Sequence, residues 1–128
     1  MESTNYFDTI ILVADDCPVD VAEAPPRRDP PTVAQIQYDL LVDAPYVHTS
    51  DDVVYESNGR RRDIDRTTFF SKGQPCLRSS PLTKRYGFGI HSDAAGRVAL
   101  VPVESETYRR LADDPAVATV KAMRSSRR

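Results

Sequence analysis

A dense run of prolines early in the chain limits what it can fold into. Five of the ten prolines fall within residues 17–31. Proline fixes φ and lacks the N–H that a helix or a strand ladder needs, so we predict a loop with polyproline character there. A buried strand is predicted before it, over Asn5–Ala14, because Ile10–Val13 is continuously apolar. Since the segment before the loop is too short to be a domain, we expect one domain over residues 1–128.

Two helices are predicted after the loop. Thr32 is a good N-cap, and Gln35 three residues later completes a capping box for a helix over Thr32–Asp43. Apolar residues recur at helical spacing along this segment, and a proline stops it. Ser50 is expected to cap a second, short helix, which Asn58–Gly59 would end.

The second half of the chain adds mixed elements. They are a helical turn from Ser80–Pro81 to Gly87, strands at Phe88–His91 and Val98–Val103, a helix over Ser105–Asp113 and a strand over Val117–Met123. The tail, residues 124–128, is expected to fray. This order predicts an α+β fold, a mostly antiparallel sheet with helices packed on one face.

Charge is divided unevenly along the chain. Residues 1–59 carry two basic and twelve acidic side chains, whereas residues 60–128 carry fifteen basic and seven acidic ones. Either the two halves compensate each other on the surface, or the second half presents a basic face to an anion. The isoelectric point of about 5.6 lies below the range of dedicated nucleic-acid binders, so that class is not favoured.

The stretch Phe69–His91 is the candidate binding site. It reads FFSKGQPCLRSSPLTKRYGFGIH, contains no acidic residue, and suits a tightly turned basic loop that receives an anion. The predicted ligand contacts are Lys72, Gln74, Arg78, Ser79, Ser80, Lys84 and Arg85. Free amides at the helix start after Ser80 would add donors. Alternatively, these groups cap helices and pair with Asp51, Asp52 or Glu104.

This block also carries a family resemblance. Together with NYFDT near the start, VESETYRRLADDP later and VKAMRSS at the end, it resembles a family of small bacterial proteins catalogued as a domain of unknown function. The resemblance covers nearly the whole chain and implies a single domain, but it implies no activity, substrate or catalytic residue. The chain looks shorter than the family pattern between Glu56 and Thr68, so we do not expect Arg60–Arg62 to form a shared site.

Cys76 suggests an alternative, enzymatic function. Its neighbours Lys72 and Arg78 would favour the thiolate, and His48 or His91 could act as its base. A buried, inert thiol is the simpler interpretation, because free cysteine is among the most buried residue types. An enzyme is therefore the less favoured of the two functions.

No metal or cofactor is predicted. Cys17, Cys76, His48 and His91 do not fall at metal-ligand spacing. No apolar run is long enough to cross a bilayer, the N-terminus lacks a secretory pattern, and the two cysteines form no disulfide framework, so we expect a cytoplasmic location. The sequence favours a binding or accessory protein for an anionic small molecule or an acidic protein surface, with weak nucleic-acid binding third and the oligomeric state open.

Overall fold

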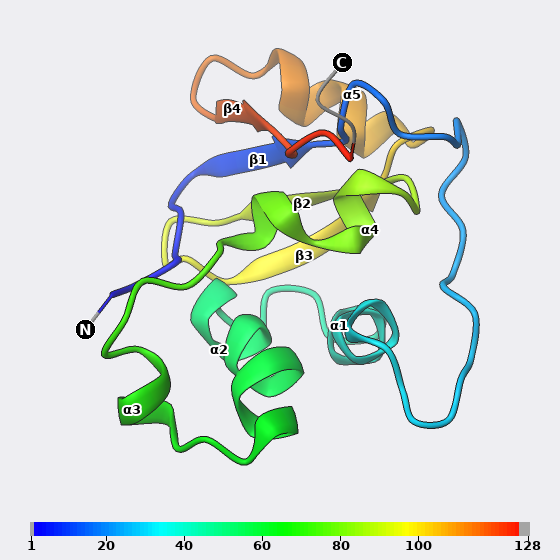
Figure 1. Cartoon of the computed structure of the whole chain (residues 1–128). Coiled ribbons are helices and arrows are strands. Elements are labelled where there is room, and N and C mark those ends of the chain that lie inside the picture. Colours follow the sequence, from blue (N-terminus) through cyan, green and yellow to red (C-terminus); the bar gives the residue numbers. More distant parts are fainter. Residues whose placement is uncertain (1, 126–128) are drawn as a thin grey trace.

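A four-stranded sheet organises the computed structural model, which describes residues 2–125 (Figure 1). The strands are β1 (Thr9–Leu12), β2 (Phe88–Ser92), β3 (Val98–Pro102) and β4 (Ala118–Lys121), in the order β3-β2-β1-β4. β1 pairs antiparallel with β2 and parallel with β4, so the first and last strands lie side by side. The predicted α+β class and mostly antiparallel sheet are confirmed.

The predicted hairpin is formed by β2 and β3. The strands pair in register from Phe88 opposite Pro102 to Ser92 opposite Val98. Asp93 fixes the turn, because its Oδ1 accepts hydrogen bonds from the N–H groups of Ala95 and Arg97, both at 2.9 Å. The turn chemistry that the sequence predicts here is local, so the hairpin forms where expected.

Two helices begin at the predicted caps. α1 (Val33–Leu41) starts after Thr32, whose Oγ1 accepts from the Gln35 N–H at 3.2 Å. The second half of the predicted capping box is wrong, because the Gln35 side chain instead accepts a hydrogen bond from the N–H of Arg28. α5 (Glu106–Asp113) starts after Ser105, as predicted.

The prediction for the second helix is wrong at both ends. α2 (Ser50–Val54) is capped by Thr49, which forms a complete capping box with Asp52. The chain then continues past Asn58 as a π-helical turn, η1 (Tyr55–Gly59), and a 3₁₀ turn, η2 (Arg60–Arg62). It ends at Asp63, which has a φ of 58°.

Gly59 is required by packing rather than by a helix end. Its backbone is helical, with φ −72° and ψ −54°. A Cβ at this position would lie 2.6 Å from the ring of Tyr55 and 2.9 Å from the ring of Phe69. The glycine therefore lets an aromatic cluster approach the helix backbone closely.

The helices cover both faces of the sheet. Phe88 packs with Ala34 of α1 and Leu82 of α4 (Pro81–Lys84), so these helices lie on the face to which Phe88 and Ile90 point. Ile90 shares its core cluster with α2 and α3 (Arg66–Phe69). Gly89 points to the other face, where a Cβ would lie 2.8 Å from the ring of Tyr108 in α5. Packing on one face is thus confirmed for α1–α4, whereas α5 lies on the opposite face.

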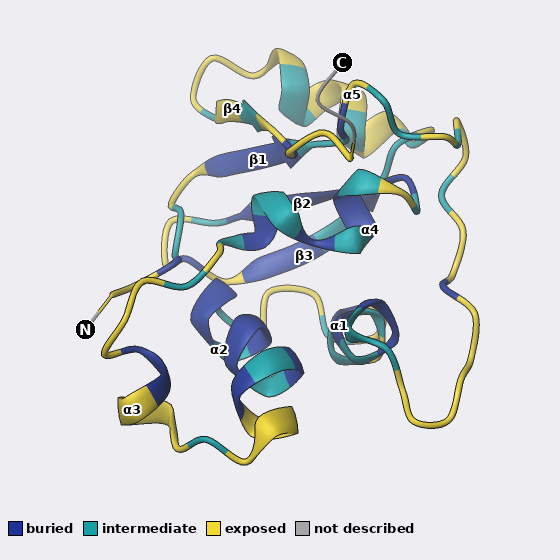
Figure 2. Ribbon diagram, in the orientation of Figure 1, coloured by how far each residue is buried: buried dark blue, intermediate teal, exposed yellow. Residues whose placement is uncertain are grey.

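The main core cluster joins the sheet to α2 and α3, and Figure 2 shows many buried positions on the central strands and on α2. Phe69 and Phe70 anchor there as predicted, with ring centroids 4.9 Å apart, and Tyr55 packs edge-on against Phe69 at 5.7 Å. α5 contains no buried residue. The face with α2 and α3 therefore carries most of the aromatic packing.

The proline-rich stretch forms no helix or strand, as predicted, but it is fastened along its length. The Ala22 N–H donates to Glu104, and the Glu23 N–H donates to the carbonyl of Tyr86, both at 3.0 Å.

None of the helices within residues 2–125 is long and apolar enough to cross a membrane. The predicted fraying falls mainly on residues 126–128, which lie outside the described part of the chain.

Candidate functional site

A pocket of about 480 Å³ lies where α1, the segment 54–62 and the stretch 74–81 meet. Small-molecule sites commonly have volumes of roughly 300–1,000 Å³. The polar lining residues are Gln37, Asn58, Arg62, Gln74, Ser79 and Ser80. The other lining residues are Val33, Val54, Pro75, Cys76, Leu77 and Pro81. The lining described here thus combines apolar walls with a few hydrogen-bonding groups and contains no acidic side chain.

A buried hydrogen-bond network fixes one wall of this pocket. Ser80 Oγ donates to Gln37 Oε1 at 2.6 Å, and Gln37 Nε2 donates to Ser57 Oγ at 3.1 Å. Ser57 Oγ in turn donates to the carbonyl of Val53 at 2.8 Å. Because Gln37 and Ser57 are almost fully buried, this satisfied network holds α1, η1 and the start of α4 in one arrangement.

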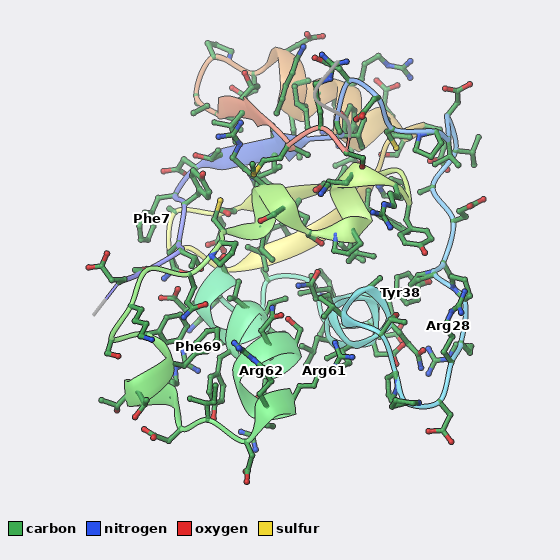
Figure 3. The ribbon with its side chains drawn as sticks, viewed as in Figure 1. Phe7, Arg28, Tyr38, Arg61, Arg62 and Phe69 are labelled. Atoms are coloured by element: carbon green, nitrogen blue, oxygen red, sulfur yellow. The ribbon has the colours of Figure 1, made fainter. Side chains whose placement is uncertain are left out.

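Arg62 supplies the only charge among the lining residues described for this pocket. Its Nε donates to the carbonyl of Asn58 at 3.1 Å, and its guanidinium carbon lies 6.0 Å from the ring centroid of Phe69. Figure 3 shows Arg61 and Arg62 on the segment that continues α2. Within residues 2–125 only the Nε of Arg62 is hydrogen-bonded, so its terminal N–H groups are available to a ligand.

Irregular backbone positions Asn58 and Arg62. Both lie in the π and 3₁₀ turns that extend α2, and Asp63 follows in the left-handed region. π-helical turns occur frequently at functional sites, and a positive φ is uncommon for a residue other than glycine. The irregular turns that carry Asn58 and Arg62 therefore form part of the pocket wall.

The structure brings only part of the predicted site together. Gln74, Ser79 and Ser80 line the pocket, with Gln74 Nε2 bonded to the carbonyl of Phe69 at 2.7 Å and Ser79 Oγ to the carbonyl of Cys76 at 2.9 Å. The four predicted cations are not among the lining residues, namely Lys72, Arg78, Lys84 and Arg85. The neutral residues of the predicted site therefore line the pocket, whereas its cationic residues lie outside the lining.

Arg78 is held at the edge of the sheet. Its Nε donates to the carbonyl of Lys121 at 2.7 Å, and its own carbonyl accepts from the N–H of Met123 at 2.8 Å. β4 is an outer strand, so its outward carbonyl groups lack a partner strand. Arg78 thus covers an exposed strand edge.

The prediction that the start of α4 has free amide N–H groups is wrong. Ser80 Oγ accepts from the N–H of Leu82 at 3.1 Å, and the Ser80 carbonyl accepts from the N–H groups of Thr83 and Lys84. The residue before them is Pro81, which has no N–H. The helix start therefore offers no unbonded donor for an anion.

The expected pairing with Asp51, Asp52 or Glu104 is also wrong. The carboxylate of Asp51 is buried and accepts three hydrogen bonds from the N-terminal residues Ser3 and Thr4. Asp52 forms a salt bridge with Arg66 at 2.9 Å, and Glu104 fastens the proline-rich loop. These acids therefore secure other parts of the fold.

Cys76 is paired with a tyrosine. Its Sγ lies 3.4 Å from Oη of Tyr6 and is half-buried. Burial, followed by the contact with Cys76, raises the pKa of the Tyr6 phenol, while nearby Arg78 opposes this rise. Phenol, thiol and guanidinium therefore form a small cluster that adjoins the pocket through Cys76, one of its lining residues.

Neither of the histidines predicted as a base, His48 and His91, is a described partner of the Cys76 thiol. His91 alternates with Ile90 and so lies on the sheet face covered by α5, where its Nδ1 is 2.8 Å from Oη of Tyr46. Burial lowers the pKa of the His91 imidazole. The carbonyl of His48 pairs with the N–H of Val98 at the β3 edge. The geometry thus does not bring Cys76 together with either histidine.

Comparison with known proteins places the chain in a family. Residues 1–128 match the model of a family of unknown function. The chain belongs to the DUF6157 family. No curated protein and no solved structure matches it. The predicted resemblance to a family of unknown function, which rests mainly on the block 69–91, is confirmed.

Three polar lining residues of this DUF6157 member that the sequence did not indicate as site residues had a signal, namely Gln37, Asn58 and Arg62. Val54, Asn58 and Arg62 follow one another at intervals of four, which places them on one face of a continuous helix. Val33 and Gln37 show the same interval in α1. For Asn58 and Arg62 the signal was hidden because Asn58–Gly59 was interpreted as a helix end and because the family resemblance did not favour Arg60–Arg62 as a site.

Proposed function

We propose that this protein is a binding or accessory protein that holds a small anionic molecule in the pocket between α1, the segment 54–62 and residues 74–81. The observation that carries the proposal is Arg62, whose terminal N–H groups are unbonded at a pocket whose described lining has no acidic side chain. A cation without a counter-charge at a partly apolar hollow favours a negatively charged ligand.

The pocket favours a small molecule over an acidic protein surface, the other ligand expected from the sequence. A flat protein surface would meet the exposed side chains of Lys72 and Arg85, which lie outside the pocket lining. A small molecule could instead contact Arg62 and the apolar walls at the same time.

Enzymatic use of Cys76 is not part of this proposal, because its described partner is Tyr6 rather than a base. As part of the same proposal, we place the protein in a bacterial cytoplasm. Both cysteines are free thiols, which suits a reducing compartment.

The proposal is tested by a thermal-shift panel of carboxylates, sugar phosphates and nucleotides on the purified chain at low and moderate salt. A ligand that binds only the folded state raises the unfolding midpoint with concentration. We expect a hit that Arg62→Met removes and Arg61→Met retains, since both side chains are exposed but only Arg62 lines the pocket. If no compound raises the midpoint, or if both variants behave alike, the proposed function is wrong.

A further inference from the structure

We propose that the ligand of this pocket is a monocarboxylate with an apolar body, an inference that rests on the proposed function. Arg62 would bind the carboxylate, and the walls formed by Val33, Val54, Leu77 and Pro81 would contact the body. Three features of the site lead to this class of ligand: its single cation, its bonded polar wall and the fixed position of Arg62.

The single cation argues against phosphorylated ligands. A phosphoryl group carries about two negative charges near neutral pH and is commonly bound by several cations or by helix N-terminal amides. Among the described lining residues, Arg62 is the only cation, and the amides at the start of α4 are already bonded. Lys72, Arg78, Lys84 and Arg85 lie outside the lining, and the Nε of Arg78 is bonded to the carbonyl of Lys121. A carboxylate, with one charge and two oxygens, matches what remains.

The bonded polar wall argues against sugars and other polyols. Ser80, Gln37 and Ser57 bond one another and the backbone, and Asn58 Nδ2 is bonded to the Val54 carbonyl at 3.4 Å and to Ser57 Oγ at 3.3 Å. Many hydroxyl groups placed here would leave water without finding enough partners, which is unfavourable. An apolar body has no such requirement and gains from leaving water.

The position of Arg62 favours a two-point contact with the ligand. The hydrogen bond from Nε to the carbonyl of Asn58 and the contact with the ring of Phe69 hold the guanidinium from two sides. The edge that carries the terminal nitrogens is left for the ligand, and this edge matches the two oxygens of a carboxylate. Because these two contacts restrain the exposed side chain, less conformational entropy is lost when the ligand binds.

The test is isothermal titration calorimetry of the full chain with matched probes. These are hexanoate, hexanamide and hexyl phosphate, together with phenylacetate and phenylacetamide. The amides keep the apolar body and remove the charge. We expect at least one carboxylate to bind about tenfold or more tightly than its amide, because hydrogen bonds between charged groups are stronger than neutral ones. Hexyl phosphate should bind no more tightly than hexanoate.

Two variants connect this preference to the site. Arg62→Met should lower the affinity for the carboxylate to that of its amide, and Arg62→Lys should restore only part of it, because lysine cannot form the two-point contact. Arg61→Met, in the same turn but outside the pocket lining, should leave both affinities unchanged. Equal affinity for carboxylate and amide, tighter binding of hexyl phosphate, or equal losses in both methionine variants would overturn the inference.

Failure of the inference can be separated from failure of the proposed function. If compounds from the broader thermal-shift panel bind in an Arg62-dependent way but none of these carboxylates does, the ligand class is wrong and the pocket remains a binding site. If no compound of either set binds, both proposals fail.

Discussion

The guanidinium of Arg78 donates a hydrogen bond to the carbonyl of Lys121 at 2.7 Å, across 43 residues of sequence. Lys121 ends β4, an outer strand of the sheet. A residue whose sequence context suggests ligand binding therefore has a structural role, because it satisfies a carbonyl that no strand pairs.

Arg78→Ala should accordingly reduce stability and leave ligand binding unchanged. The loss of one hydrogen bond to a charged donor should lower the free energy of unfolding by about 1 kcal/mol. Urea denaturation of the variant measures this change, and calorimetry of the same preparation measures binding. Unchanged stability together with a loss of ligand affinity in this variant would show that Arg78 belongs to the binding site instead.

Gly59→Ala should destabilise the fold, because its Cβ would lie within 3 Å of the rings of Tyr55 and Phe69. Both rings belong to the buried aromatic cluster and have little room to move, so we expect a cost of about 1–3 kcal/mol. Thermal unfolding followed by circular dichroism measures it.

Gly73→Ala is the matched control for this prediction. At Gly73 the nearest atom to an added Cβ is in the flexible Glu2 side chain, 3.9 Å away, so stability should change by less than about 0.5 kcal/mol. Equal effects of the two substitutions would contradict a packing role for Gly59.

Ser80→Ala should remove two contacts at once. It would leave Gln37 Oε1 without its donor in a buried position, and it would remove the cap from α4. We expect a loss of about 1–3 kcal/mol in the free energy of unfolding, measured with urea. The neighbouring Ser79→Ala removes a hydrogen bond from a half-buried hydroxyl and should cost less. Equal costs would show that the buried network contributes little.

The acid side of the stability profile should depend on Asp52. Burial alone would raise the pKa of its carboxyl, but hydrogen bonds from Thr49 and the salt bridge with Arg66 outweigh burial and lower that pKa below its usual value. A lowered folded-state pKa contributes stability above the unfolded-state pKa, and this contribution is lost as pH falls through the folded-state value. Stability should therefore decline more steeply below about pH 4 with Asp52 than without it.

Asp52→Asn isolates this charge. Asparagine retains an oxygen that can accept from the Thr49 N–H, but it cannot form the salt bridge with Arg66. We expect the free energy of unfolding to fall less steeply with acid in the variant than in the unmodified chain. Parallel profiles across the acid range would exclude Asp52 as a source of the pH dependence.

The parts of the fold that depend on local chemistry could be predicted from the sequence. Thr32 and Ser105 cap their helices as expected, and the hairpin forms because Asp93 bonds its own turn. The parallel pairing of β1 with β4 joins the two ends of the chain, and no short-range pattern indicates it. The position of Arg78 follows from that pairing, so its role could not be predicted either.

The candidate site was predicted only where it is local in sequence. Gln74, Ser79 and Ser80 were identified within one basic block, and all three line the pocket. Arg62 was missed because Asn58–Gly59 suggested a helix end and because the chain looks shorter than the family pattern around Arg60–Arg62, whereas here Gly59 accommodates the ring of Tyr55 from its own turn and the ring of Phe69 from α3. The helical backbone thus continues through Gly59, and the site's cation lies in the segment Arg60–Arg62, which the family resemblance did not favour.

The most direct test of the account is an amide NMR titration of the full chain with hexanoate. We expect shifts concentrated at the residues that line the pocket on α1, the segment 54–62 and the stretch 74–81, and we expect these shifts to be lost in Arg62→Met but not in Arg61→Met. Two results would contradict the assignment of this pocket as the binding site. One is a set of shifts centred on Lys84 and Arg85, and the other is no shift with hexanoate in a chain that binds other anions at Lys84 and Arg85.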